Sequence, residues 1–245
     1  NPIEKYLKCK DLKELYGFEE SDIANMMGEK TSQIKDWLDI MKLMDDYLHY
    51  LGYDGIYTRL DKREGQFVDL NNYLSRYSNG SVYVDWGYDD SDLADLKSVC
   101  FDYIRAQYEG KEFRHIAKIS GNDSIFCKGE IWREFLDRHI DEVEQLSESE
   151  QAVEHLRAEN PEEDLSKILE TRDYEWKEQT KNSLKGNLYR SIHAMELVNE
   201  ANQPTKLLTR AIESISKINT DIETFYSEEV ESLLADINSL AWDLR

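Results

Sequence analysis

Hydrophobic residues recur every three or four positions over most of the chain, which is the spacing of one face of an α-helix. This pattern predicts helices over residues 3–16, 20–27, 31–51, 92–108 and 130–146. From about residue 165 to residue 245 it predicts helices only, with apolar stripes at 208–222 and 230–244 and a break at Gln203-Pro204. Ser227 is placed to cap the last helix. The expected fold class is mainly α.

Residues 53–92 follow the helical pattern least well. They contain four glycines and the pair Asn79-Gly80, which lies between Tyr77 and the alternating Val82-Tyr83-Val84. An Asn-Gly pair between apolar residues is typical of a β-hairpin. We therefore expect a small irregular segment with a hairpin near residues 77–84, within a mixed, mostly helical middle region over residues 53–146.

The segment from Glu19 to Leu38 carries the most specific pattern in the chain. A helix-turn-helix needs a small residue where its helices touch, a glycine in the turn, and large apolar residues that dock the second helix. Ala24 fills the small position, Gly28 follows four residues later, and Ile34 and Trp37 follow Gly28 by six and nine. The spacing indicates an N-terminal helix-turn-helix domain over residues 1–52. Such a motif either binds DNA or forms a purely structural corner.

The net charge restricts where nucleic acid could bind. The 245 residues include 30 Lys and Arg against 51 Asp and Glu, which gives a net charge of −21. A protein that coats DNA needs a basic face, so any DNA contact must be local. The acidic excess is larger in residues 129–245 than in residues 1–128. We expect the contact in the N-terminal half, and an acidic C-terminal helical bundle or helical hairpin over residues 165–245 that serves oligomerisation.

Cysteine content and hydropathy suggest a cytoplasmic protein. Cys9, Cys100 and Cys127 are unevenly spaced, cannot all pair, and occupy apolar positions. They are expected to be buried thiols in a reducing compartment. No run approaches 18 apolar residues, so no membrane span is expected.

The first part of the chain resembles a known family. The residues concerned are Asn1-Pro2-Ile3-Glu4, Ile23-Ala24, Gly28 and Ser32-Gln33-Ile34, followed by Leu38, Met41 and Leu43. Together they resemble the central helix-turn-helix domain of ParB-like DNA-binding proteins. The resemblance covers about the first 45–50 residues. It departs from the family pattern at Lys30, Thr31 and Trp37, where a capping Ser, an Arg and a smaller residue are common.

The resemblance implies a function and a missing part. It implies sequence-specific binding of double-stranded DNA by a bacterial, plasmid- or phage-encoded protein of segregation, transcriptional regulation or defence. In this family an N-terminal ParB/sulfiredoxin-like domain precedes the motif, and CTP binding or hydrolysis belongs to that domain. We therefore expect further residues before this chain, and no cofactor in the chain itself. A third hypothesis is an enzyme whose catalytic part lies in that upstream domain.

In a DNA-binding helix-turn-helix, the start of the second helix faces the major groove. Gln33 could read adenine and Lys35 could read guanine or contact a phosphate, while Lys30 lies at the helix start, where backbone amides favour phosphate. The full candidate DNA-binding set is Lys30, Thr31, Ser32, Gln33, Lys35, Asp36, Lys42, Arg59, Lys62 and Arg63. A helix cap with a solvated face is the alternative for residues 31–33. At residues 59–63 the interleaved Asp61 and Glu64 favour a charge-compensated loop over a DNA contact.

No residue pattern indicates a metal or catalytic site. The aspartates over residues 85–95 lack the order of a calcium loop, and the five histidines are scattered. Two alternatives stay open. The helix-turn-helix could be a structural element of an acidic protein-protein interaction module. This interpretation is favoured if Glu29, Asp36 and Asp39 cancel the charge of Lys30, Lys35 and Lys42. The C-terminal stripes could pack within one chain or form a homodimer.

Overall fold

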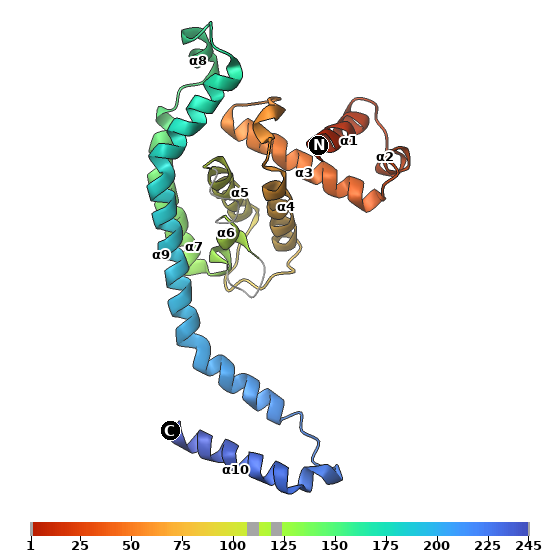
Figure 1. Ribbon diagram of the computed structural model, residues 1–245, viewed down its shortest axis with the longest axis vertical. Helices are drawn as coiled ribbons and strands as arrows, with labels where there is room; N and C mark the ends of the chain where they lie inside the picture. The colour runs from red at the N-terminus through yellow and green to blue at the C-terminus, as the bar shows by residue number, and fades with distance from the viewer. Residues whose placement is uncertain (1, 107–112, 119–123, 245) are drawn as a thin grey trace. The chain divides into compact units, whose positions relative to one another are not determined.

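The computed structural model describes residues 2–106, 113–118 and 124–244, and these residues form helices and no strand (Figure 1). The mainly α fold class is thereby confirmed. None of the helices in the described residues combines the length and apolar composition that a membrane crossing needs. The α-helices are α1 (Pro2–Glu14), α2 (Glu20–Met27), α3 (Thr31–Leu51), α4 (Glu64–Ser78), α5 (Asp90–Arg105), α6 (Arg114–Ala117), α7 (Gly129–Ser149), α8 (Val153–Glu159), α9 (Leu165–Ile215) and α10 (Glu228–Asp243).

Packing divides the chain into two units, which we call unit 1 (Asn1–Glu196) and unit 2 (Leu197–Arg245). The boundary lies inside α9. The first part of α9 belongs to unit 1 because Leu169, Trp176 and Leu184 are buried in its core. Beyond Met195, no described residue is buried.

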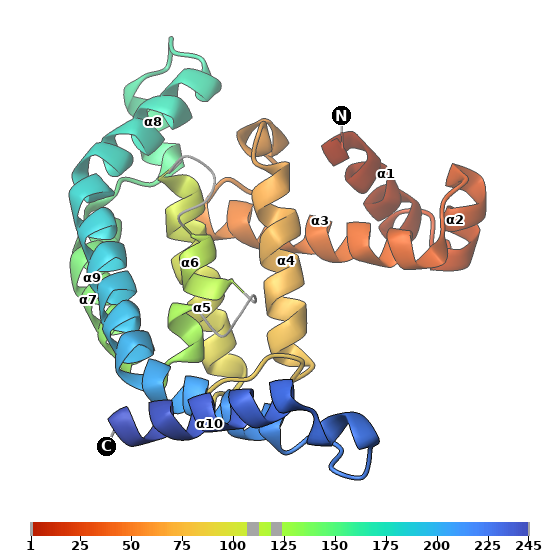
Figure 2. The same cartoon turned by 60° about the horizontal axis from the view of Figure 1, so that its bottom comes forward.

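The N-terminal part of unit 1 consists of α1, α2 and α3. Tyr6 and Cys9 of α1 and Ile23 of α2 are buried against α3, which contributes Ile34 and Trp37. Figure 2 shows α1 and α2 beside the N-terminal half of α3, while α4 crosses its C-terminal half. The predicted bounds of α2 and α3 are confirmed, because Gly28 and Gly52 end these helices in the left-handed conformation.

The predicted hairpin near residues 77–84 is wrong. Residues 64–78 form α4, whose Phe67, Leu70 and Tyr77 are buried. Gly80 has a φ of +67° and donates its N–H to the Tyr77 carbonyl. Asn79-Gly80 therefore closes a helix, since an Asn-Gly pair suits a helix C-terminus as well as a hairpin turn. The irregular segment is real but shorter than expected, because α4 occupies much of it.

The rest of unit 1 is built on α5, α7 and the first part of α9. Figure 2 shows α7 and α9 side by side, and the Asn187 amide on α9 donates to the Phe135 carbonyl on α7 at 2.9 Å. The three cysteines are free and buried, as predicted. The helix predicted over residues 92–108 begins at Asp90 and ends at Arg105, and residues 107 and 108 lie outside the described residues.

Two predicted interruptions differ from the structure. Residues 147–164, which lie between the helices predicted over 130–146 and from about 165, contain the end of α7 and the short helix α8. The break at Gln203-Pro204 is wrong, because α9 continues through Pro204. Proline removes one backbone donor and clashes with the preceding turn, at a cost of about 3 kcal/mol, and α9 nevertheless continues to Ile215. Ser227 caps α10 as predicted, accepting the Val230 N–H.

We predict opposite effects of alanine at two glycines of unit 1. Gly28 has a φ of +71°, which costs an L-residue about 1–2 kcal/mol, so Gly28→Ala should lower the free energy of unfolding by about that amount. Gly186 lies inside α9 with open space where a β-carbon would lie, so Gly186→Ala should raise it by about 0.5–1 kcal/mol. Equilibrium urea unfolding measures both. Equal effects at the two sites would contradict the conformational explanation.

Candidate nucleic-acid interface

Backbone hydrogen bonds and dihedral angles define the turn between α2 and α3. The N–H groups of Gly28 and Glu29 both donate to the Ala24 carbonyl at the end of α2. Lys30 is extended, with φ −83° and ψ 146°, and its carbonyl accepts the Ile34 N–H, so that α3 begins at Thr31. Three residues thus redirect the chain between the two helices.

Burial on one side of this pair of helices leaves the other side open. Ile23 and Ile34 are completely buried and Ala24 is 3% exposed, so the helices meet through these side chains. The Cys9 thiol lies 3.3 Å from the Met27 sulfur and adds α1 to the contact. The start of α3 points away from this core. Exposed side chains there are Lys30, Thr31, Ser32, Lys35 and Asp36, with Gln33 half-buried.

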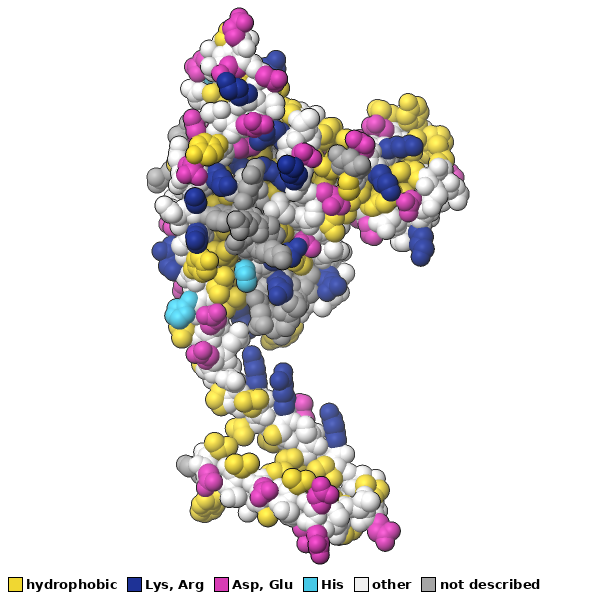
Figure 3. Space-filling model, in the orientation of Figure 1, with side chains coloured by type: hydrophobic (Ala, Val, Ile, Leu, Met, Phe, Trp, Pro, Cys, Tyr) yellow, Lys and Arg dark blue, Asp and Glu magenta, His cyan; other side chains and the backbone are white. Residues whose placement is uncertain are grey.

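Charges of both signs surround this exposed start. Lys35 lies 3.6 Å from Glu20, which also accepts from Lys13 at 2.5 Å, and Lys5 lies 3.8 Å from Glu29. The hydrogen bond from Lys13 lowers the pKa of Glu20 below its usual value, and the charge of Lys35 adds to this effect. On the face shown in Figure 3, basic and acidic side chains alternate over α1–α3.

Two lysines of the candidate set differ from Lys35 in this respect. Lys30 and Lys42 are exposed, and no ion pair joins either of them to a carboxylate in residues 2–106, 113–118 or 124–244. Lys30 directly precedes α3 and Lys42 lies in its middle, and both remain available to a phosphate. The acidic residues near α3 therefore cancel only part of the positive charge of its lysines.

The prediction that Arg59 and Arg63 flank a DNA backbone needs correction. The Arg59 side chain is 10% exposed and donates to Asp173 at 2.5 Å. Arg63 is 6% exposed and donates to the Tyr47 hydroxyl inside the core. Both guanidinium groups are thereby withdrawn from the surface. Of this group only Lys62 is exposed, at a φ of +63°.

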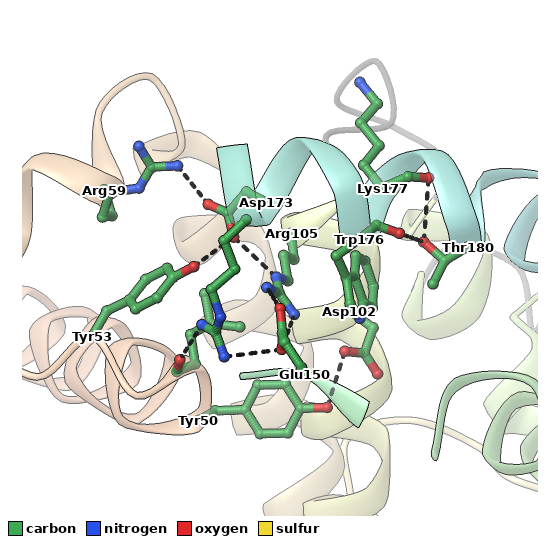
Figure 4. Close-up of polar contacts among 12 residues, drawn as sticks. Tyr50, Tyr53, Arg59, Asp102, Arg105, Glu150, Asp173, Trp176, Lys177 and Thr180 are labelled. Carbon is green, nitrogen blue, oxygen red and sulfur yellow. Dashed lines mark hydrogen bonds and ion pairs between the residues drawn. The ribbon is translucent and has the colours of Figure 1, made fainter. Parts of the chain in front are cut away.

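Arg59 is one member of a buried set of charges, shown in Figure 4, that sequence reasoning missed. We call Arg59, Arg105, Glu150, Arg172 and Asp173 the buried ion cluster. Asp173 is 5% exposed, and its carboxylate accepts from Arg59 at 2.5 Å and from Arg105 at 3.0 Å. The Tyr53 hydroxyl also donates to Asp173, at 2.9 Å. Burial alone would raise the pKa of Asp173, but Arg105 and Arg59 outweigh it and lower that pKa.

Glu150 supplies the second carboxylate of the buried ion cluster. Both of its oxygens accept from Arg105, at 2.5 and 3.1 Å, and Arg172 lies 3.0 Å away. Arg105 lies over the Trp176 ring at 4.6 Å. Arg172 donates to the Leu51 carbonyl at 2.8 Å. The cluster therefore joins the C-terminal end of α3 to α5, α9 and the residue after α7.

A second buried polar group lies nearby. The Asp102 carboxylate on α5 accepts from the Tyr50 hydroxyl and contacts His139 Nε2, each at 2.9 Å. Burial and the charge of Asp102 raise the pKa of Tyr50. These residues border a pocket of about 290 Å³ between α5 and α7. The contacts link α3, α5 and α7 and so continue the attachment that the buried ion cluster makes.

The sequence contains one signal for the buried ion cluster. Asp173 comes four residues after Leu169 and three before Trp176, so it shares their buried face of α9. A carboxylate at such a position needs a buried partner. In the described part of the chain, no three His, Cys, Asp or Glu side chains are grouped so that they could hold a metal ion.

Comparison with protein-family models, with curated proteins and with solved structures finds no match to this chain.

We predict that Asp173→Asn destabilises unit 1 in a pH-dependent way. Because the pKa of Asp173 is lower in the folded state than its ordinary value of 3.8, its contribution is present above pH 3.8 and lost as the pH falls through the folded value. At neutral pH the variant should lose about 3 kcal/mol or more, since the arginines lose their counter-charge.

Denaturant unfolding at neutral pH and at about pH 3 or below checks this sign. The difference between wild type and Asp173→Asn should shrink on acidification. The exposed Asp141→Asn, a matched change on α7, should stay within about 0.5 kcal/mol of wild type. A difference that is independent of pH would argue against the ionised Asp173.

Proposed function

We propose that the chain binds double-stranded DNA sequence-specifically, as a ParB-like helix-turn-helix protein of segregation, transcriptional regulation or defence. The observation that carries the proposal is the turn at Gly28, which buries Ile34 and leaves Thr31, Ser32 and Lys35 exposed at the start of α3. In helix-turn-helix proteins, the start of the second helix contacts base edges in the major groove.

The exposed side chains have defined parts in this proposal. Gln33 pairs with an adenine edge, and Lys35 contacts guanine or a phosphate. Thr31 and Ser32 offer hydroxyl groups to bases or phosphates, and Asp36 can accept from a cytosine amino group. Lys30, Lys42 and Lys62 contact phosphates. Arg59 and Arg63 are left out, because both are buried.

Electrostatics sets the conditions for such binding. The Lys35–Glu20 contact spans 3.6 Å and the Lys35 side chain is 61% exposed, so this pair contributes little to stability and can open. A phosphate or a guanine then replaces Glu20 as the partner of Lys35. With a net charge of −21 the rest of the chain repels DNA, so affinity depends on a few cations and falls with added salt.

A second copy of the chain is the proposed partner of α9 within unit 2. Leu208, Ile212 and Ile215 are 40–65% exposed and follow one another at steps of three and four. Lys206 and Arg210 lie two residues from this stripe and project from the other side of the helix. Two such stripes can pair without bringing like charges together. Two-fold symmetry also suits the reading of paired half-sites.

The second candidate function is an acidic protein-protein interaction module. It is favoured by the ion pairs of Lys5 and Lys35 with Glu29 and Glu20, which reduce the positive charge near α3. It is also favoured by the exposed apolar residues of unit 2. In this case the α2–α3 turn has a structural role only.

The DNA-binding proposal predicts a loss of affinity in two variants. Gln33→Ala and Lys35→Ala should each weaken specific duplex binding by about 1–3 kcal/mol, since each removes one base contact. The measurement selects bound sequences from a random duplex pool and then determines affinity by fluorescence anisotropy at stated salt concentrations. Lys185→Ala is the matched control for Lys35→Ala, because it removes the same charge from the exposed side of α9.

The outcomes separate the two candidate functions. Loss of affinity in the Gln33 and Lys35 variants with no loss in the Lys185 variant supports base contact by α3. Failure of the wild-type chain to enrich any sequence shifts the conclusion to the interaction module.

The dimer proposal is tested separately. Ile212→Asp should convert the dimer to a monomer in sedimentation velocity, because it places a charge in the apolar stripe. Thr209→Asp makes a similar change beside the stripe and should leave the dimer intact. A monomeric wild-type chain would remove the second copy from the proposal.

A further inference from the structure

The last helix, α10, has an apolar side that the described residues leave largely exposed. Val230, Leu233, Ile237, Leu240 and Leu244 follow one another at alternating steps of three and four. No residue of α10 is buried, and Leu233 and Leu240 are 56% and 64% exposed. Alternating steps of three and four are the a and d positions of a coiled-coil heptad. The helix is therefore shaped to pair with another helix along this stripe.

Carboxylates follow one edge of the stripe. Glu229, Asp236 and Asp243 are spaced by seven residues and occupy the g positions of the same heptad. The sequence of α10 contains no Lys or Arg. Among the described residues, no ion pair involves any of these three carboxylates. The edge thus presents three unpaired negative charges in a row beside an apolar surface.

The charge pattern of this edge selects the kind of helix that fits. In an antiparallel pair of two α10 helices, the g edges face each other and the carboxylates repel. In a parallel pair, each g position faces an e position, which in α10 is Leu234 or Ala241 and offers no counter-charge. A helix with Lys or Arg at its e positions instead pairs with all three carboxylates. Charge complementarity therefore favours a basic helix over a second α10.

We propose that α10 docks a basic amphipathic helix of a partner protein, apolar stripe against apolar stripe, with Lys or Arg beside Glu229, Asp236 and Asp243. This surface is distinct from the start of α3 and goes beyond DNA binding. It also differs from the proposed dimer stripe on α9, whose charged residues do not form such an edge. The bound helix covers the exposed leucines of α10, and its cations neutralise the acidic edge.

The test uses the full chain and two synthetic three-heptad peptides. Both peptides carry Ile at a and Leu at d, and one carries Lys and the other Glu at e and g. Fluorescence anisotropy of the labelled peptides should show saturable binding of the Lys peptide, with the Glu peptide weaker by about tenfold or more. Leu240→Ser should abolish binding of the Lys peptide, because it removes a buried d contact.

Two matched double variants separate this docking from general attraction between a basic peptide and an acidic protein. Glu229→Lys with Asp236→Lys changes the edge and should reverse the preference toward the Glu peptide. Glu228→Lys with Glu231→Lys changes the net charge equally at positions away from the stripe and should keep the preference for the Lys peptide.

Three outcomes would overturn the proposal. The first is an equal loss of Lys-peptide binding in both double variants, which would show a non-specific charge effect. The second is self-association of the chain that Leu240→Ser abolishes, which would show that a second copy occupies α10. The third is no saturable binding of either peptide. Because the DNA-binding residues are unchanged in every variant, none of these outcomes decides the proposed function of α3.

Discussion

Burial of Asp173 together with three arginines is the constraint on which the arrangement of unit 1 depends. A carboxylate at 5% exposure is costly unless its charge and lone pairs are satisfied. Arg59, Arg105 and Tyr53 satisfy it from segments more than sixty positions away in the chain. Each of these charges would be unfavourable if it were buried alone. Because they pair with one another, they fix the position of α9 against α3 and α5. A purely apolar contact could tolerate sliding between these helices, whereas paired hydrogen bonds hold one geometry.

Burial of arginine side chains also determines which cations remain on the surface. Arg59 and Arg63 are the first arginines of the chain, and both serve the interior. Through Leu51 the sequence contains lysines but no arginine. Guanidinium groups recognise guanine with two hydrogen bonds, whereas an ammonium group acts as a point charge. Base readout by α3 would consequently draw on Gln33 and the hydroxyl side chains more than on its cations.

The local parts of the fold were predictable and the distant contacts were not. The bounds of α2 and α3 follow from apolar spacing and from Gly28 and Gly52, which act on their immediate neighbours. The same local reasoning fails at Asn79-Gly80, where one dipeptide suits two kinds of turn and the burial of Phe67 and Leu70 decides between them. It also fails for Arg59, whose partner lies 114 positions further along the chain. At the start of α3, the sequence identified Lys30, Thr31, Ser32, Lys35 and Asp36 as exposed, but not that Gln33 is half-buried or that Lys35 is near Glu20.

The two ends of α3 have different surroundings, and this has a mechanical consequence. Its 21 residues extend over about 30 Å. The C-terminal end is held through the Leu51 carbonyl by Arg172, while the first turn projects into solvent. A rigid rod fixed at one end moves at its tip in proportion to its length, so a small rotation at the anchor becomes a displacement of whole ångströms at Thr31. The accuracy with which that tip meets any surface is thus set far away from it, by the stiffness of its attachment.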